Sequence, residues 1–124
     1  MNLVDSSGWL EYFADGPNAD FFAGPIKSKQ LVVPTISIAE VFKRVLQQRS
    51  ESAALQATAL MQQGEVVPLD LPTAVNAAKL GLALQLPLAD SVILATARLY
   101  QATLWTQDAD FEGLPGVRFT PKKK

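Results

Sequence analysis

The chain has 124 residues, of which 48% are hydrophobic and 19% charged, and this length and composition predict one folded globular domain spanning residues 1–124. His and Cys are both absent, which excludes a Ser-His-Asp triad, His-assisted RNA transesterification, thiol catalysis and zinc sites built from these side chains. The net charge of −1 means that a nucleic-acid ligand would have to be held by a local basic patch or by cations bound at acidic groups.

Short apolar runs alternate with helical segments along the chain, the pattern of an α/β protein with a parallel sheet. In chain order, we expect a strand at 3–5, helices at 6–13 and 18–23, a strand at 31–33, helices at 37–49 and 51–63, a strand at 66–67, helices at 71–84 and 91–100, and strands at 104–106 and 117–119. Helix ends are indicated by Gly24-Pro25 and Gly64, and a helix start by Asp70 with Pro72. The helix at 91–100 is apolar nearly all round, so we expect it in the interior or in an interface.

Five acidic residues occupy positions that differ from those of ordinary surface carboxylates. Asp5 ends the first strand, and Asp108 and Asp110 lie in the loop after the fourth. Because the carboxyl ends of parallel strands line the crevice where ligands bind, these three side chains are expected at one edge of the sheet. Asp90 opens the most apolar helix, and Glu40 lies in the first turn of the helix that follows the second strand.

Several of these residues also have purely structural explanations. Ser37 and Glu40 match a capping box, in which the Glu side chain reaches back to a backbone N–H. Glu40 and Arg44 are spaced as an i,i+4 ion pair. Asp90 could cap its helix, and Asp108 could be a turn residue. Taken singly, each position is therefore ambiguous.

Taken together, the carboxylates favour a metal site. Like charges gathered at short range repel one another unless one of them stays protonated, and a divalent cation resolves that conflict. Oxygen ligands without His or Cys point to Mg²⁺ or Mn²⁺ rather than zinc. Calcium is compatible with the same ligands, although no EF-hand spacing is present.

Four segments, in order and over essentially the whole chain, resemble the signature segments of PIN-domain nucleases, and most closely those of VapC-type toxins. They are Leu3-Val4-Asp5-Ser6-Ser7, Ile36-Ser37-Ile38-Ala39-Glu40-Val41, Leu88-Ala89-Asp90-Ser91-Val92-Ile93-Leu94-Ala95-Thr96-Ala97 and Leu104-Trp105-Thr106-Gln107-Asp108-Ala109-Asp110-Phe111. The resemblance implies a PIN-like three-layer α/β sandwich, with a parallel central sheet flanked by helices.

The resemblance also implies which residues form the site. Asp5, Glu40, Asp90 and Asp108 would be the catalytic acidic residues; the metal ligands would be Asp5, Asp90, Asp108 and Asp110; hydroxyl groups of Ser6 and Thr106 would support the pocket. Members of this family are Mg²⁺- or Mn²⁺-dependent endoribonucleases, usually homodimeric, that are inhibited by a small cognate antitoxin. We therefore expect a metal-dependent endoribonuclease with RNA as substrate and an antitoxin as partner.

The proposed chemistry is hydrolysis of a phosphodiester by a metal-activated water, which does not need the ribose 2′-OH, so the RNA assignment rests on the resemblance. An alternative is a non-catalytic α/β binding module whose acidic pocket holds a structural cation. A phosphoacceptor receiver domain is a third reading. It is disfavoured because that fold places a paired acid after its first strand and a Lys after a later one, whereas here Ser6 follows Asp5 and Gln107 follows Thr106.

Basic and aromatic residues suggest further contacts. Lys43, Arg44 and Arg98 are candidates for binding RNA phosphates, while the basic tail at 122–124 is expected to be disordered. Aromatic residues crowd the N-terminal part of the chain and could form a core or a groove for the antitoxin or a second protomer: Trp9, Tyr12, Phe13, Phe21 and Phe22.

Nothing in the sequence suggests membrane insertion or secretion. No apolar run reaches the roughly 20 residues of a membrane span. The first residues, Met1 to Asp5, have no basic region and include a carboxylate, unlike a signal peptide. We therefore expect a cytoplasmic protein without membrane contact.

Overall fold

A five-stranded parallel sheet, with the strand order β3-β2-β1-β4-β5, forms the centre of the computed structural model, which describes residues 1–123. The strands are β1 (Asn2–Val4), β2 (Leu31–Pro34), β3 (Glu65–Val67), β4 (Thr103–Thr106) and β5 (Val117–Phe119). All five expected strands are present, and the expected last edge strand pairs with β4 in parallel.

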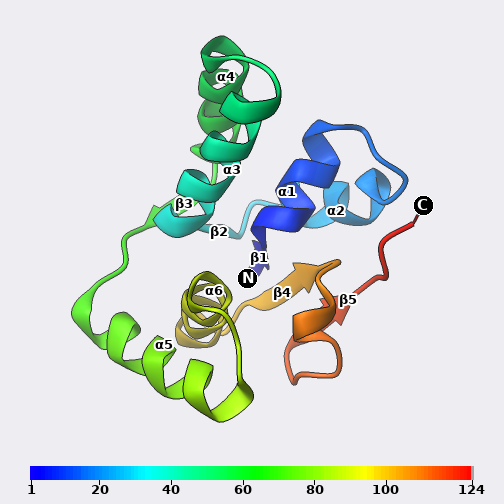
Figure 1. Ribbon diagram of the computed structural model, residues 1–124. Coiled ribbons are helices and arrows are strands. Elements are labelled where there is room, and N and C mark those ends of the chain that lie inside the picture. Colours follow the sequence, from blue (N-terminus) through cyan, green and yellow to red (C-terminus); the bar gives the residue numbers. More distant parts are fainter. Residues whose placement is uncertain (124) are drawn as a thin grey trace.

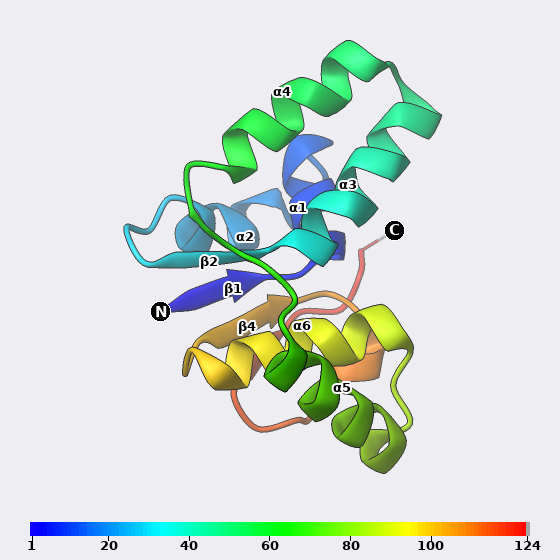
Figure 2. The same ribbon diagram turned by 90° about the vertical axis from the view of Figure 1, so that its left-hand side faces the viewer.

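Helices cover both faces of the sheet, as Figures 1 and 2 show. Their bounds are α1 (Ser6–Phe13), α2 (Ala19–Ile26), α3 (Thr35–Gln48), α4 (Glu51–Met61), α5 (Leu71–Leu84) and α6 (Leu88–Leu99), with a short 3₁₀ helix, η1 (Ala109–Phe111), after β4. Helices α1 to α4 lie on one side and α5 and α6 on the other (Figure 2). The predicted three-layer α/β sandwich is confirmed.

The sequence produces these layers because successive strand residues face opposite sides. In β1, Leu3 packs into a cluster with Ile93 of α6, whereas Val4 packs into a cluster with Trp9 of α1. Both strand residues are fully buried, as expected for a central strand of a parallel sheet. Of the N-terminal aromatic residues, Trp9 and Phe22 are also fully buried, so these two belong to the core rather than to a partner surface.

The strand order reverses direction between β1 and β4. From β1 the chain moves outward through β2 to β3, then returns through α5 and α6 to β4 on the other side of β1. In open α/β sheets, ligands bind outside the carboxyl ends of the strands at such a reversal. Asp5, directly after β1, and Asp108, shortly after β4, therefore flank this position.

Several helix boundaries differ from the sequence prediction, and three of these differences involve a proline. Helix α3 begins at Thr35, with Pro34 as its N-cap, so Ser37 lies inside the helix and the predicted capping box with Glu40 does not form. Likewise, α6 is preceded by Pro87 as N-cap, which places Asp90 in the first turn rather than at the cap. Both helices start directly after a proline because its restricted φ suits a helix entry.

The third difference is the end of α2. The helix continues through Gly24 and Pro25 to Ile26 instead of stopping before them. Pro25 removes one backbone donor near the helix end, and the turn is still closed by hydrogen bonds from Lys27 N to Ala23 O and from Ser28 N to Pro25 O.

Within the described residues, no single helix is long and apolar enough to span a membrane; only α5 and α6 taken together pass such a test, and they are bent by 115°. The prediction of a disordered tail at 122–124 falls partly on Lys124, which lies outside the described residues.

Candidate active site

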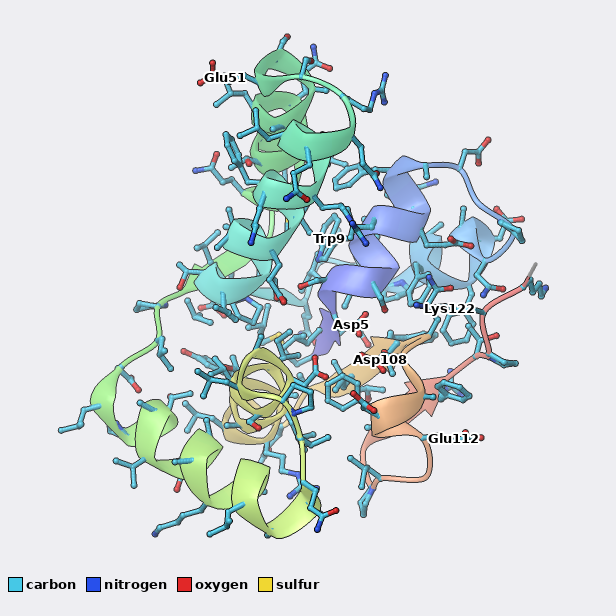
Figure 3. The ribbon with its side chains drawn as sticks, viewed as in Figure 1. Asp5, Trp9, Glu51, Asp108, Glu112 and Lys122 are labelled. Atoms are coloured by element: carbon cyan, nitrogen blue, oxygen red, sulfur yellow. The ribbon has the colours of Figure 1, made fainter. Side chains whose placement is uncertain are left out.

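An acidic pocket of about 420 Å³ lies at the carboxyl end of the sheet, between α1, α3 and α6. Its charged lining residues are Asp5, Glu11, Glu40, Arg44, Asp90, Asp108 and Lys122. Figure 3 shows Asp5 and Asp108 close together at the ends of β1 and β4. The four carboxylates expected to be catalytic thus face one space, although they lie far apart in the sequence.

Asp5 lies at the base of this pocket and is only 3% exposed. It is the N-cap of α1: its Oδ1 accepts hydrogen bonds from Gly8 N at 2.9 Å and from Ser7 Oγ at 2.8 Å. Burial raises the pKa of Asp5 to about 6, although the hydrogen bonds that it accepts favour the charged form. The same carboxylate therefore fixes the start of α1 and contributes a negative charge that is costly to bury.

Thr106, the last residue of β4, connects Asp5 to Asp108. Its Oγ1 donates to Asp5 Oδ2 at 2.6 Å and accepts from the backbone N of Asp108 at 2.9 Å. Thr106 is fully buried. This hydroxyl, which was expected to support the pocket, thus connects the loop after β4 to the residue that follows β1.

Asp90, Asp108 and Asp110 form a group of carboxylates of a size that could hold a metal ion: one oxygen from each lies within 4.8 Å of the others. Partial burial raises the pKa of Asp90 to about 7, and neighbouring carboxylates, Asp108 first among them, add to the rise. Asp108 Oδ1 also accepts from Asp110 N at 2.9 Å, so the turn of η1 holds these two residues together. Asp110 is exposed and does not itself line the acidic pocket.

Glu40 reaches the pocket from the second turn of α3. Its Oε1 accepts a hydrogen bond from Ser6 Oγ at 2.6 Å. Glu40 therefore does not make the capping contact that its spacing from Ser37 allowed, and its bond to Ser6 links the starts of α1 and α3. The expected support by Ser6 is therefore directed at Glu40, while Thr106 supports Asp5.

Some of the basic residues near the site line the acidic pocket, and others do not. Arg44 lines the acidic pocket from α3, and Lys122 lines it from the C-terminal segment. Lys43 is exposed and is not among the lining residues. Arg98 lines a different hollow beside α5, eight residues and about 12 Å further along α6 than Asp90. Of the three predicted phosphate-binding residues, only Arg44 is brought to the pocket.

Two buried amides beside the site were not identified from the sequence. Asn18 Nδ2 donates to Gln107 Oε1 at 2.9 Å, and Gln107 Nε2 donates to Ser7 O at 3.4 Å. Gln107 stands inside the signature segment around Asp108, so its position was a usable signal. Asn18 lies in a Gly-Pro-Asn break that reads as an ordinary turn, and nothing in the sequence connects it with residues almost ninety positions away.

The donor set fits a hard divalent cation. Asp90, Asp108 and Asp110 each place one carboxylate oxygen within 4.8 Å of the others, and the neighbouring carboxylates, after burial, contribute to the raised pKa of Asp90. Oxygen donors of this kind suit Mg²⁺ and Mn²⁺. Asp90, Asp108 and Asp110 could hold such an ion directly, with Asp5 adding negative charge from the base of the pocket.

Residues 3–117 match the family model of the PIN domain, and the chain therefore belongs to the PIN domain family. No curated protein sequence matches it.

Solved structures with a similar fold include a toxin and toxin–antitoxin complexes. A chain of a toxin–antitoxin complex from Klebsiella pneumoniae is 26% identical, with a TM-score of 0.81 and coverage of 100% of both chains. VapC20 of Mycobacterium tuberculosis, a toxin that cleaves the sarcin–ricin loop, is 14% identical, with a TM-score of 0.79 over 93% of this chain and 95% of that one. DNA-bound VapBC from Salmonella typhimurium is 15% identical, with a TM-score of 0.77 and 98% coverage of each chain. The VapC-like resemblance of the sequence is confirmed.

Proposed function

We propose that this protein is a Mg²⁺- or Mn²⁺-dependent endoribonuclease and the toxin of a toxin–antitoxin pair. The observation that carries the proposal is the group formed by Asp90, Asp108 and Asp110 inside a PIN domain. The similarity to a toxin–antitoxin complex over the whole chain supports the toxin assignment. RNA as the substrate class is supported by the similar fold of VapC20, which is described as a toxin that cleaves the sarcin–ricin loop.

Each acidic residue has a role that follows from its surroundings. Asp90, Asp108 and Asp110 would hold the cation; Asp5, which was also predicted as a ligand, is buried, accepts a hydrogen bond from Thr106 and would add negative charge beside them. Bound there, the cation would stabilise charge on the phosphate and lower the pKa of a water nucleophile. Glu40 keeps one oxygen on Ser6, and its other oxygen can accept a hydrogen bond from that water and orient it.

The direct test is digestion of RNA by the purified protein with Mg²⁺ or Mn²⁺, with and without a chelator. We expect cleavage by the wild type that stops on chelation and falls by about a hundredfold or more in Asp5→Asn and Asp90→Asn. Equal cleavage by all three proteins would disprove the assignment. Saturable binding of Mn²⁺ with RNA left intact would instead support the alternative of a non-catalytic module with a structural cation.

We further propose that a cognate antitoxin regulates the enzyme in the cytoplasm and that the enzyme acts as a homodimer. Phe13 lines a second, more apolar hollow between α1, α3 and α4, which shares Leu10 with the acidic pocket. An amphipathic antitoxin helix docked there would reach the site. Co-expression of this protein with the antitoxin, followed by measurement of the molecular mass of the purified species, tests both the antitoxin partner and the homodimer. Recovery of this protein as a free monomer would contradict both.

A further inference from the structure

The C-terminal segment returns to the acidic pocket. After β5, the backbone N of Thr120 donates to Thr106 O at 3.1 Å, which prolongs the pairing with β4. One residue later, Pro121 O accepts a hydrogen bond from Asn18 Nδ2 at 3.0 Å. Lys122 follows directly and lines the same pocket as Asp5 and Asp108, and Figure 3 shows it on the C-terminal segment that leaves β5. The segment is thus held in place up to the residue before Lys122.

Asn18 is the residue that fixes this return. It is 3% exposed, and its single amide nitrogen donates both to Pro121 O and to Gln107 Oε1. Gln107 precedes Asp108, so the amide joins the C-terminal segment to the loop that carries two of the carboxylates. A buried amide with two short hydrogen bonds holds its partners more firmly than contacts between exposed side chains do.

The charges around the pocket are distributed unevenly. Among the described lining residues, five carboxylates face two cations, Arg44 on α3 and Lys122 on the C-terminal segment. These two elements lie on either side of α1 in Figure 1. A bound divalent ion neutralises the phosphate that reacts, but the neighbouring phosphates of an RNA strand would still meet an acidic surface. Cations on the two sides of the pocket are placed to receive them.

We propose that Lys122, held in place by Asn18, binds an RNA phosphate next to the scissile one, with Arg44 binding on the opposite side of the pocket. This inference rests on the proposed nuclease function and names a substrate-binding residue for it. Lys122 is a binding residue here, and Asn18 is a positioning residue that acts through the backbone of Pro121.

The test measures binding of an unstructured, mixed-sequence single-stranded RNA in the presence of Mn²⁺. Phosphate contacts carry no sequence information, so the natural substrate is not required. The measurement uses an Asp5→Asn background, which keeps the group of Asp90, Asp108 and Asp110 and prevents cleavage. Lys122→Gln is compared with Lys123→Gln, a matched control that removes the same charge one residue further along, outside the pocket lining.

We expect Lys122→Gln to weaken binding about three- to fivefold, the effect of one solvent-exposed charge contact. The plot of the logarithm of the RNA association constant against the logarithm of the salt concentration should become less steep by about 0.7, the contribution of one phosphate contact on a single strand. Lys122→Arg should restore both values, and Asn18→Ala should reproduce the smaller slope. Lys123→Gln should leave the slope unchanged.

Equal RNA binding and equal salt slopes in Lys122→Gln and Lys123→Gln would overturn the inference while wild-type cleavage leaves the nuclease assignment intact. Tighter Mn²⁺ binding by Lys122→Gln with unchanged RNA binding would also overturn it, because Lys122 would then be a counter-ion of the carboxylates. A wild type that neither cleaves nor binds RNA would overturn both proposals.

Discussion

At the scale of single residues, Asp5 combines a structural and a chemical task. Its Oδ1 caps α1 through Gly8 N, and its Oδ2 accepts a hydrogen bond from Thr106 Oγ1, while the side chain lines the acidic pocket. A sequence can suggest either task but cannot show that both belong to one side chain. Burial raises the pKa of Asp5 to about 6, so keeping this carboxylate charged at neutral pH is costly, and a nearby cation would favour the charged form.

This double role predicts that two substitutions at Asp5 have different effects on stability. Asp5→Asn keeps a side-chain acceptor at the cap and removes the buried charge, so the free energy of unfolding should stay the same or rise at pH 8. Asp5→Ala loses the cap and leaves Thr106 without its acceptor, and should cost about 1–3 kcal/mol. Urea unfolding measures both values, and both variants should lose metal-dependent RNA cleavage. Equal destabilisation by Asn and Ala would contradict the capping role.

Asp90 predicts how the stability of the metal-free protein depends on pH. Its pKa is raised to about 7 from the ordinary 3.8, so the folded state binds the proton more strongly than the unfolded state does. The resulting stabilisation is complete below pH 3.8 and is lost as the pH rises through about 7. The melting temperature in chelator should therefore fall between pH 5 and pH 8, less steeply in Asp90→Asn, and Mn²⁺ should raise it more at pH 8. An equal fall in wild type and variant would contradict this assignment.

The acidic residues of the site were predictable because each lies next to a recognisable strand or helix. The residues that hold them in place were not. Ser37 and Glu40 matched a capping box, yet Ser37 is fully buried inside α3 and Glu40 bonds to Ser6. Asn18 and Lys122 could be found only once the chain was folded, because their contacts join segments that are distant in sequence.

At the scale of helices and strands, α1 depends on one close approach. A Cβ at Gly8 would lie 2.6 Å from side-chain atoms of Phe22 and of Val4, nearer than real contacts allow. Gly8 also donates its backbone N–H to Asp5. Because Gly8 has no side chain, α1 can pack closely against β1 and α2. In this position its first turn is capped by the Asp5 carboxylate.

Two glycines in neighbouring helices should respond oppositely to the same change. Gly8→Ala should lower the free energy of unfolding by about 1–3 kcal/mol through overpacking, and should reduce RNA cleavage by displacing Asp5. Gly24 lies in α2, where an added Cβ meets nothing within 4 Å, so Gly24→Ala should raise stability by about 0.5–1 kcal/mol. Urea unfolding of the two variants decides the matter. A stability loss of similar size in both would mean that packing over β1 is not the cause.

The periodicity of apolar residues predicted where the helices lie and roughly how long they are, but it did not predict every helix start. The sequence placed the start of the third helix at Ser37, because the apolar stripe of Ile38, Val41 and Val45 begins there. In the structure the turn after β2 is already made at Pro34, so α3 begins at Thr35. Local signals compete at a boundary, and the position of the preceding strand in the sheet decides between them.

At the scale of the whole molecule, the strand order creates the site. Asp5 and Thr106 are 101 residues apart in sequence, yet Thr106 Oγ1 lies 2.6 Å from Asp5 Oδ2, because β4 pairs with β1 and not with β3. The sequence predicted parallel strands whose ends carry carboxylates, but strand order depends on long-range pairing that no local pattern encodes. The family resemblance did not give the strand order but implied that the carboxylates meet in one acidic pocket, and the PIN domain match agrees with that family.

Binding of Mn²⁺ measured by titration calorimetry tests most directly whether these carboxylates form a cation site. The wild type should show saturable binding that is lost in Asp108→Asn, while Asp20→Asn, which changes an exposed residue of α2 away from the pocket, should bind as the wild type does. Undiminished binding by Asp108→Asn, or no saturable binding by the wild type, would contradict the proposed metal centre and the nuclease mechanism built on it.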